Sequence, residues 1–258
     1  MEISHFWVAL ALKTISAADL KEGGTILGML LRYWIAQCIE LYADVGHGTG
    51  ESLLLLLSDP SIPRPSHLVG ITSLEIHHHR SRDRVATLQA TNQNKVSVDL
   101  HQRDAVFDGV APSVHPLNPS SPITFDSILA LDCAYHFNTR HKFLEQSFQK
   151  LRPGGSIALA DICFSSSALN TRRTRLITRI LNLIPTYNQI STEDYVDQMK
   201  QIGYVDVILE DVTSEVFPGF VPFLKSRGWK WWAFGSLIDW YSSTGARFVI
   251  VSGKRQAF

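Results

Sequence analysis

The stretch DVGHGTGESLLLLL, residues 44–57, decides how the rest of the sequence is interpreted. The apolar run Leu41–Val45 leads into its glycines and predicts a strand, and the leucines after Ser52 predict the start of a helix. In open α/β sheets, ligands bind beyond the carboxyl ends of strands, where glycines let the backbone approach closely and a helix N-terminus offers free N–H groups. The loop is therefore interpreted as a ligand cradle, and the alternative is a turn that only joins strand to helix.

The glycine spacing disfavours two common kinds of nucleotide site. A dinucleotide-binding G-x-G-x-x-G pattern that begins at Gly46 would need a further glycine at position 51, where the sequence has Glu51. A phosphate-binding loop of the Walker type needs Gly-Lys followed by Ser or Thr, which the segment does not contain. We therefore expect neither NAD nor a nucleoside triphosphate as the ligand.

Seven short apolar runs, separated by turn residues or by stretches of helical character, predict the strands of one sheet. The first five are almost unbroken in hydrophobicity, which is typical of parallel strands buried on both faces. The last two flank a long aromatic-rich segment and can close the sheet as an antiparallel pair. The expected fold is α/β, with a doubly wound, mostly parallel sheet of seven strands. The runs are Leu41–Val45, Leu68–Ile71, Val96–Leu100, Phe125–Leu131, Ser156–Ile162, Tyr204–Leu209 and Phe248–Ser252.

The composition limits the classes of partner and compartment. Lys and Arg together number 24 and so do Asp and Glu, so the 258-residue chain lacks the cationic field that drives most nucleic-acid binding, and no nucleic-acid partner is expected. Cys38, Cys133 and Cys163 lie in apolar segments without C-x-x-C spacing, which favours a reducing, cytoplasmic location. The N-terminus does not read as a signal peptide, and no segment reads as a membrane span.

The glycine loop resembles the first motif of the class I S-adenosylmethionine-dependent methyltransferases, which has the form acidic-x-Gly-x-Gly-x-Gly and appears here as DVGHGTG. Further motifs that resemble this family follow in order and extend the resemblance over about residues 40–165. The blocks FDSILALDCAYHF and LRPGGSIALADI are most similar to the small-molecule branch that includes sterol, tocopherol and sugar O-methyltransferases. The later motifs are LVGIT (68–72), RDA (103–105), FDSILALD (125–132) and LRPGGSIALAD (151–161).

The resemblance implies S-adenosyl-L-methionine as the cofactor and assigns residues to its parts. The loop glycines would admit its methionine end, and the Asp44 carboxylate can accept a hydrogen bond from its ammonium group. Asp104 is suited to accept from the adenine amino group, with a helix N-cap as its alternative role. The cofactor-binding residues expected on this basis are Asp44, Gly46, Gly48, Gly50, Thr72, His77, Asp104, Ala105 and Asp132.

One of these positions departs from the family pattern. Most class I methyltransferases have an acidic residue at the end of the second strand that holds both ribose hydroxyls, whereas this sequence has Thr72. In the tocopherol-like branch Thr or Ser is often found there, and a downstream polar side chain, here His77, takes over. Glu75 competes with both for that role. Because the run His77 to His79 would point about 100° apart from residue to residue on a helix, we expect no metal site there.

The block after the fourth predicted strand contains a candidate catalytic base, His136. An unperturbed histidine pKa near 6.5 suits removal of a proton from an acceptor at neutral pH. The sugar O-methyltransferases that this block resembles have a catalytic histidine here and an aspartate after the fifth strand, which Asp161 matches. The alternative is that His136 only orders the loop.

These assignments predict an enzyme that methylates a small hydrophobic acceptor, with O-methylation favoured because His136 and Asp161 offer base chemistry. The alternatives are C- or N-methylation, and a cofactor-binding regulatory protein without catalysis. We expect a single domain. It would comprise a helical cap over 1–40, a cofactor-binding core over 41–165, substrate-side insertions over 166–245 and the last strand over 246–258.

The segment before the last strand is rich in aromatic residues between positions 229 and 241. As a helix it would place Trp229, Trp232, Leu237, Trp240 and Tyr241 on roughly one face. That face is interpreted as packing on the sheet, covering the acceptor pocket or touching lipid, since tryptophan favours interfaces. Peripheral contact with an anionic membrane would be assisted by arginines of the preceding insertion, for which a solvated charged face is the favoured explanation. These are Arg172, Arg173, Arg175 and Arg179.

Overall fold

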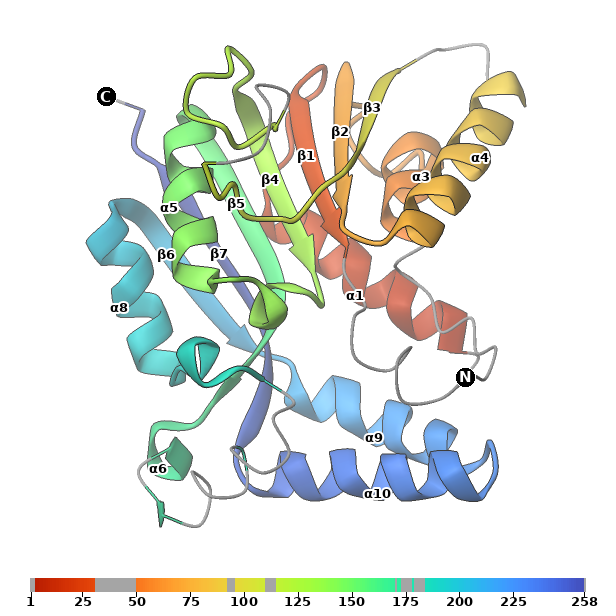
Figure 1. The fold of residues 1–258 in the computed structure, drawn as a ribbon, viewed down its shortest axis with the longest axis vertical. Helices are drawn as coiled ribbons and strands as arrows, with labels where there is room; N and C mark the ends of the chain where they lie inside the picture. The colour runs from red at the N-terminus through yellow and green to blue at the C-terminus, as the bar shows by residue number, and fades with distance from the viewer. Residues whose placement is uncertain are drawn as a thin grey trace.

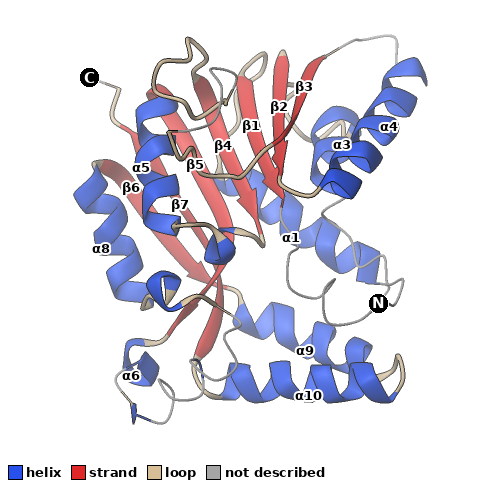
Figure 2. Cartoon of the chain, viewed as in Figure 1, coloured by secondary structure: helices blue, strands red, loops and turns tan. Residues whose placement is uncertain are grey.

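A computed structural model describes residues 3–30, 50–91, 96–109, 115–169, 171–172, 178 and 184–257 of the chain. Figures 1 and 2 show a twisted central sheet with helices packed on both faces. The strands are β1 Thr25–Leu30, β2 His67–Thr72, β3 Ser97–Gln102, β4 Phe125–Leu131, β5 Leu151–Phe164, β6 Tyr204–Asp211 and β7 Ala246–Arg255. The helices are α1 Ile3–Ala17, α3 Glu51–Ser58, α4 Glu75–Thr91, η1 Ala134–His136, α5 Arg140–Lys150, α6 Ser166–Leu169, η2 Thr186–Asn188, α8 Thr192–Ile202, α9 Thr213–Lys225 and α10 Trp229–Ser243.

The seven described strands form one sheet in the order β3-β2-β1-β4-β5-β7-β6. Strands β1 to β5 are parallel to one another, and β7 runs antiparallel to both β5 and β6. The expectation of a mostly parallel, doubly wound α/β sheet closed by an antiparallel pair is confirmed. The carboxyl ends of β1 to β5 lie at one edge of the sheet, where ligands bind in open α/β folds.

The strand that lies between β2 and β4 is not formed by the segment that the sequence predicted. Its expected segment, Leu41–Val45, lies outside the described residues, and Thr25–Leu30 occupies this position, with Ile26 opposite both Leu68 and Ser127. The expectation of a helical cap over residues 1–40 is therefore wrong in part, because this segment contains β1 as well as α1. Gly28 suits the position, since a Cβ there would lie 3.3 Å from Leu53 of α3 and crowd the helix.

Both faces of the central strands of the sheet are buried. Residues of β1, β2 and β4 alternate between two apolar clusters, so that Leu27 faces α5 and α8 while the adjacent Ile26 faces α1 and α3. This alternation is the pattern of strands covered on both sides. Edge strand β3 is an exception to the expected burial, because its side chains are exposed or half-buried.

Helices α9 and α10 pack side by side at the bottom of Figure 1, beyond the edge where the parallel strands end. The expected grouping of aromatic residues on one face of this helix is wrong in part. Trp231 and Tyr241 are buried, whereas Trp229 and Trp232 are exposed. Within the part of the chain that the structure describes, no helix has the length and apolarity needed to span a membrane.

Candidate functional site

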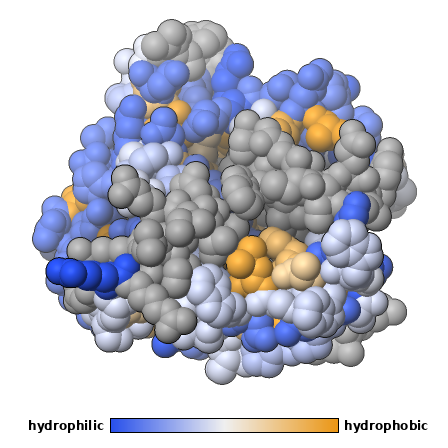
Figure 3. Space-filling view, turned by 60° about the horizontal axis from the view of Figure 1, so that its bottom comes forward, coloured by the Kyte–Doolittle hydropathy of each residue, from blue (hydrophilic) through white to orange (hydrophobic). Residues whose placement is uncertain are grey.

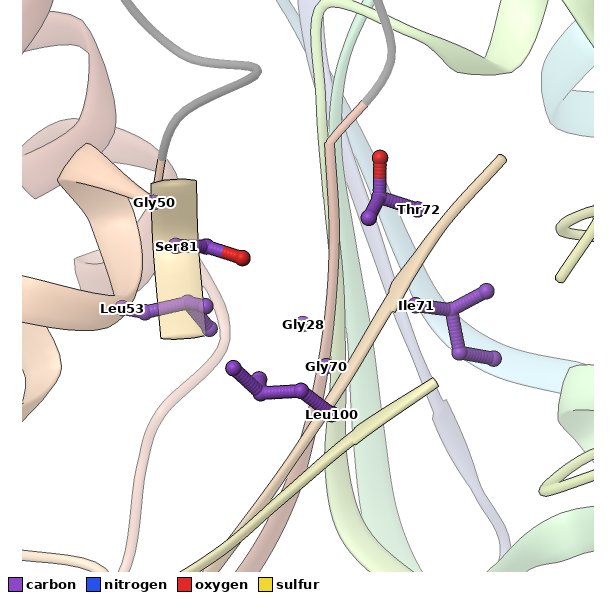
Figure 4. A pocket seen from close by; sticks show the side chains of 8 residues that line it. All are labelled: Gly28, Gly50, Leu53, Gly70, Ile71, Thr72, Ser81 and Leu100. Atoms are coloured by element: carbon purple, nitrogen blue, oxygen red, sulfur yellow. The ribbon is translucent and has the colours of Figure 1, made fainter. Parts of the chain in front are cut away.

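A cavity lies between the sheet and helices α3 and α4, close to the carboxyl ends of β1 and β2 (Figure 4). It contains about 280 Å³ of empty space, part of which is open to solvent. Its wall is mostly apolar or backbone, with two hydroxyl groups, those of Thr72 and Ser81. The lining residues are Gly28, Gly50, Leu53, Gly70, Ile71, Thr72, Ser81 and Leu100.

Two glycines leave room in the wall of this cavity. Gly50, the last residue of the predicted glycine loop, has φ +97°, and a Cβ there would come within 3.0 Å of Ser81. A Cβ on Gly70 would come within 2.6 Å of the Leu100 side chain, closer than real Cβ contacts allow. Side chains at either position would therefore close the space or displace its walls. Asp44, Gly46 and Gly48 lie outside the described residues.

The hydroxyl of Thr72 is the clearest sign of a polar ligand in this cavity. Thr72 ends β2 and is 9% exposed, and its Oγ1 is buried without a hydrogen-bond partner in the described structure. An unsatisfied buried hydroxyl costs about 1–3 kcal/mol, which a ligand hydroxyl could offset. By contrast, the Ser81 hydroxyl already donates to the carbonyl of His78, at 3.0 Å. The cavity therefore fits a group with a hydroxyl at the Thr72 end, as the ribose of an adenosyl cofactor has.

The other expected cofactor residues lie outside the cavity lining. Asp104 follows β3, and its Oδ1 accepts a hydrogen bond from the backbone N–H of Val106 at 2.9 Å, within a turn. This contact is not the helix N-cap expected as the alternative to adenine binding, because no described helix begins at this point. Ala105 is buried in the core next to it. His77 lies in the first turn of α4, where its neighbour His79 contacts Glu75 at 3.5 Å.

The turn after β4 contains Asp132 and His136 and lies at the same edge of the sheet as the cavity, where the parallel strands end. Asp132 has φ +53°, a left-handed conformation that Asp tolerates, and its Oδ1 accepts a hydrogen bond from the Tyr135 hydroxyl at 2.8 Å. His136 closes η1, with its ring centroid 4.3 Å from that of Tyr135. Burial and the nearby positive charge of Arg140 lower the pKa of His136 to about 4. Its imidazole is therefore neutral at pH 7.

Asp161 belongs to a buried ion pair on β5. It is fully buried on β5, pairs with Nε of Arg140 at 2.7 Å, and accepts hydrogen bonds from the Tyr195 hydroxyl and the Ile162 backbone at 2.8 and 2.9 Å. In the described structure, no hydrogen bond joins Asp161 to His136. Arg140 and Tyr195 contact Oδ2 of Asp161 and the Ile162 backbone N–H contacts Oδ1, so this carboxylate does not orient the His136 ring in the described structure.

Arg140 and Asn188 join this ion pair to the turn that bears His136. The Arg140 backbone N–H donates to Oδ1 of Asn188 at 2.9 Å, and its guanidinium donates to the Asn188 carbonyl at 2.8 Å. The Asn188 amide nitrogen donates to the carbonyls of Tyr135 and Phe137 at 3.0 and 2.7 Å, on either side of His136. Sequence reasoning missed both residues, because they are far apart in the sequence and carry no local motif.

No protein-family model matches the chain. The chain is 26% identical over 216 residues to erythromycin 3''-O-methyltransferase of Saccharopolyspora erythraea, an alignment that covers 80% of this chain and 59% of that protein. It is 23% identical over 175 residues to the O-methyltransferase resE of Aspergillus sclerotiorum, which covers 68% of this chain and 58% of that protein. The chain thus spans about three fifths of the length of these curated relatives.

Among solved structures, the chain is similar to geranyl diphosphate C-methyltransferase from Streptomyces coelicolor in complex with Mg²⁺, geranyl diphosphate and S-adenosyl-L-homocysteine. The TM-score is 0.67 with 13% identity, over 96% of this chain and 80% of that chain. At such low identity the similarity establishes the fold alone. Together with the sequence relatives, it shows that the chain has the class I S-adenosylmethionine-dependent methyltransferase fold and is a relative of small-molecule methyltransferases.

Proposed function

We propose that the protein transfers a methyl group from S-adenosyl-L-methionine to an oxygen of a small hydrophobic acceptor. The observation that carries the proposal is the glycine-walled cavity at the end of β2, with the buried and unsatisfied Thr72 hydroxyl in its lining. The named O-methyltransferase relatives favour oxygen over carbon or nitrogen as the acceptor atom. When bound, the cofactor would supply an electrophilic methyl group.

Residues of the cavity would hold the cofactor. The Thr72 hydroxyl would bond a ribose hydroxyl, and Gly50 and Gly70 would let the ligand approach the backbone. Asp44, Gly46 and Gly48 remain proposed contacts to the methionine end. The set of proposed contacts also includes His77, Asp104, Ala105 and Asp132.

His136 would take the proton of the acceptor hydroxyl. Its turn follows β4, which pairs with β1 on the side opposite β2, so it lies along the same edge as the cavity. Because the pKa of His136 is about 4, the ring is neutral and able to accept a proton across the physiological range. A low pKa also makes it a weak base, so proton transfer would accompany attack on the methyl group and positioning would supply much of the acceleration.

Calorimetry with S-adenosylhomocysteine tests the cofactor site. We expect Thr72→Val, which keeps the shape and removes the hydroxyl, to weaken binding by about 1–3 kcal/mol, or roughly 5- to 150-fold. Thr87→Val, on the exposed surface of α4, is the matched control and should bind as the wild type does. NAD should show no binding. The proposal would be contradicted if Thr72→Val bound S-adenosylhomocysteine with wild-type affinity, or if the wild type bound NAD and not S-adenosylhomocysteine.

Transfer of labelled methyl from S-adenosylmethionine to a panel of phenols, alcohols, amines and alkenes tests the acceptor class. We expect label in phenols or alcohols. Label only in amines or alkenes would favour N- or C-methylation, the second of which is performed by the Streptomyces neighbour. Cofactor binding without label in any acceptor would favour a regulatory role.

A further inference from the structure

The connection between α9 and α10 exposes two large aromatic side chains. We call residues 225–233 the hairpin tip; it comprises the end of α9, the turn and the first residues of α10. Trp229 is 78% exposed and Trp232 is 57% exposed. They are three positions apart on α10 and therefore neighbours on its surface. Together they form an apolar projection at the tip.

The packing of the hairpin does not need these two indoles. Trp231, which lies between them in sequence, is buried, as are Val221 and Leu224 of α9. A Cβ on Gly235 would lie 3.1 Å from Leu224, which shows how closely the two helices approach. Contacts of this kind hold α10 against α9, so the exposure of Trp229 and Trp232 has no explanation within the fold. Clustered exposed apolar side chains generally mark an interaction surface.

The charges of the tip all have the same sign. Lys225, Arg227 and Lys230 lie in this segment, which contains no acidic residue. Lys225 is paired with Asp239 at 2.8 Å. Arg227 lies over the Phe223 ring at 4.5 Å, Lys230 lies over the Trp229 ring at 5.8 Å, and the described structure pairs neither with a carboxylate. Exposed tryptophan beside cations that have no acidic partner suits an anionic, partly apolar surface.

The tip lies on the side of the molecule from which an acceptor would enter. β6 runs parallel to β5, because both strands are antiparallel to β7. α9 follows β6 and therefore starts at the edge of the sheet where β4 ends and where His136 is located. Figure 1 shows both helices beyond that edge, and Figure 3, turned to bring this side forward, shows a small apolar patch on it among hydrophilic and weakly coloured residues. A protein docked through this side would therefore keep its acceptor site close to the docking surface.

We infer that the hairpin tip docks on an anionic lipid surface. Trp229 and Trp232 enter the interfacial region, while Arg227 and Lys230 lie against headgroup phosphates. A short tip with two tryptophans and two available cations gives shallow, reversible and salt-sensitive association. The binding itself does not depend on the proposed methyl transfer. If that proposal holds, docking gives the site access to acceptors dissolved in lipid.

Vesicle sedimentation tests this inference with the full chain. We expect binding to vesicles of phosphatidylcholine with phosphatidylserine, little binding to phosphatidylcholine alone, and loss of binding at high salt. The double variant Trp229→Ser with Trp232→Ser and the double variant Arg227→Glu with Lys230→Glu should each reduce binding roughly tenfold or more. The matched control is Ile76→Ser with Tyr187→Ser, which removes large apolar side chains that are 57% and 58% exposed elsewhere. This control should bind as the wild type does.

Three results would overturn the inference: equal binding to both kinds of vesicle, wild-type binding by either tip variant, or equal loss of binding in the control variant. A wild-type dimer that the tryptophan variant converts to a monomer, seen by light scattering, would assign the tip to a second copy instead. Calorimetry with S-adenosylhomocysteine on the same variants separates the two proposals, because the tip variants should keep wild-type cofactor affinity whether or not vesicles bind.

Discussion

At the scale of single residues, His136 is the group whose protonation state matters most. We expect His136→Gln to reduce turnover of a hydroxyl acceptor by about 10²–10⁴, the usual contribution of a general base, with cofactor affinity unchanged. Because burial and Arg140 lower the pKa of His136 to about 4, wild-type activity should stay level as pH falls through the ordinary histidine range near 6.5. A pH–rate profile checks both statements. Full activity in His136→Gln, or a fall in wild-type activity centred near pH 6.5, would contradict the role or the environment assigned to this ring.

Sequence motifs located part of the site but not the partners of each residue. Thr72 and Gly50 line the cavity as the family pattern implies, because that pattern describes strand ends and turns, which are local. Asp161 was matched to an aspartate that follows the fifth strand, whereas it lies within β5, and its partners were not predictable from the sequence. Its contacts to Arg140 and Tyr195 join β5 to α5 and α8, and no spacing within either helix indicates such a pairing.

At the scale of elements, Asn188 connects η2 to the turn after β4 and to the start of α5. Its side chain makes two buried hydrogen bonds and one partly buried hydrogen bond, so we expect Asn188→Ala to lower the free energy of unfolding by about 2–4 kcal/mol. Asn188→Asp should be at least as harmful, because it places carboxylate oxygen against two carbonyls. Urea unfolding measures this, with Gln201→Ala on the exposed surface of α8 as the control. Wild-type stability of Asn188→Asp would show that the amide donors contribute nothing.

Element boundaries were predictable where one apolar run had no competitor nearby. The run Phe125–Leu131 matches β4 at both ends, and the other runs that the structure describes all lie in strands, apart from Val96, which directly precedes β3. The strand between β2 and β4 was not predictable, because Thr25–Leu30 and Leu41–Val45 are both short apolar runs of suitable length. Only pairing with β2 and β4 distinguishes them, and pairing depends on residues about 40 and 100 positions away.

At the scale of the whole molecule, alternating strands and helices were enough to predict the sheet, since parallel strands need crossover helices and those helices must cover both faces. The arrangement of side chains over the carboxyl edge was not predictable in the same way. Hydrophobic periodicity groups Trp229 and Trp232 with Tyr241, whereas packing against α9 buries Trp231 and Tyr241 and leaves Trp229 and Trp232 exposed. Periodicity identifies a helix face but cannot identify what lies opposite it.

The histidines make the stability of the whole fold sensitive to acid. Burial lowers the pKa values of His78, His101, His115 and His136, so below about pH 6.5 the unfolded chain binds protons that the folded chain does not. Stability is therefore full above that pH and falls as pH approaches the folded-state values, with His136 alone contributing on the order of 2–3 kcal/mol by about pH 4.

Urea unfolding at about pH 7.5 and about pH 5 should show a clear loss of stability at the lower pH. His136→Asn should lose less stability between the two pH values than the wild type, because its side chain does not titrate. His141→Asn, which removes a half-exposed imidazole on α5, should keep the wild-type dependence. Equal pH dependence in His136→Asn and the wild type would mean that the His136 ring is as accessible to protons in the folded protein as in the unfolded chain. The pKa of His136 would then lie near the ordinary value of about 6.5, and the level activity expected through that pH range would not hold.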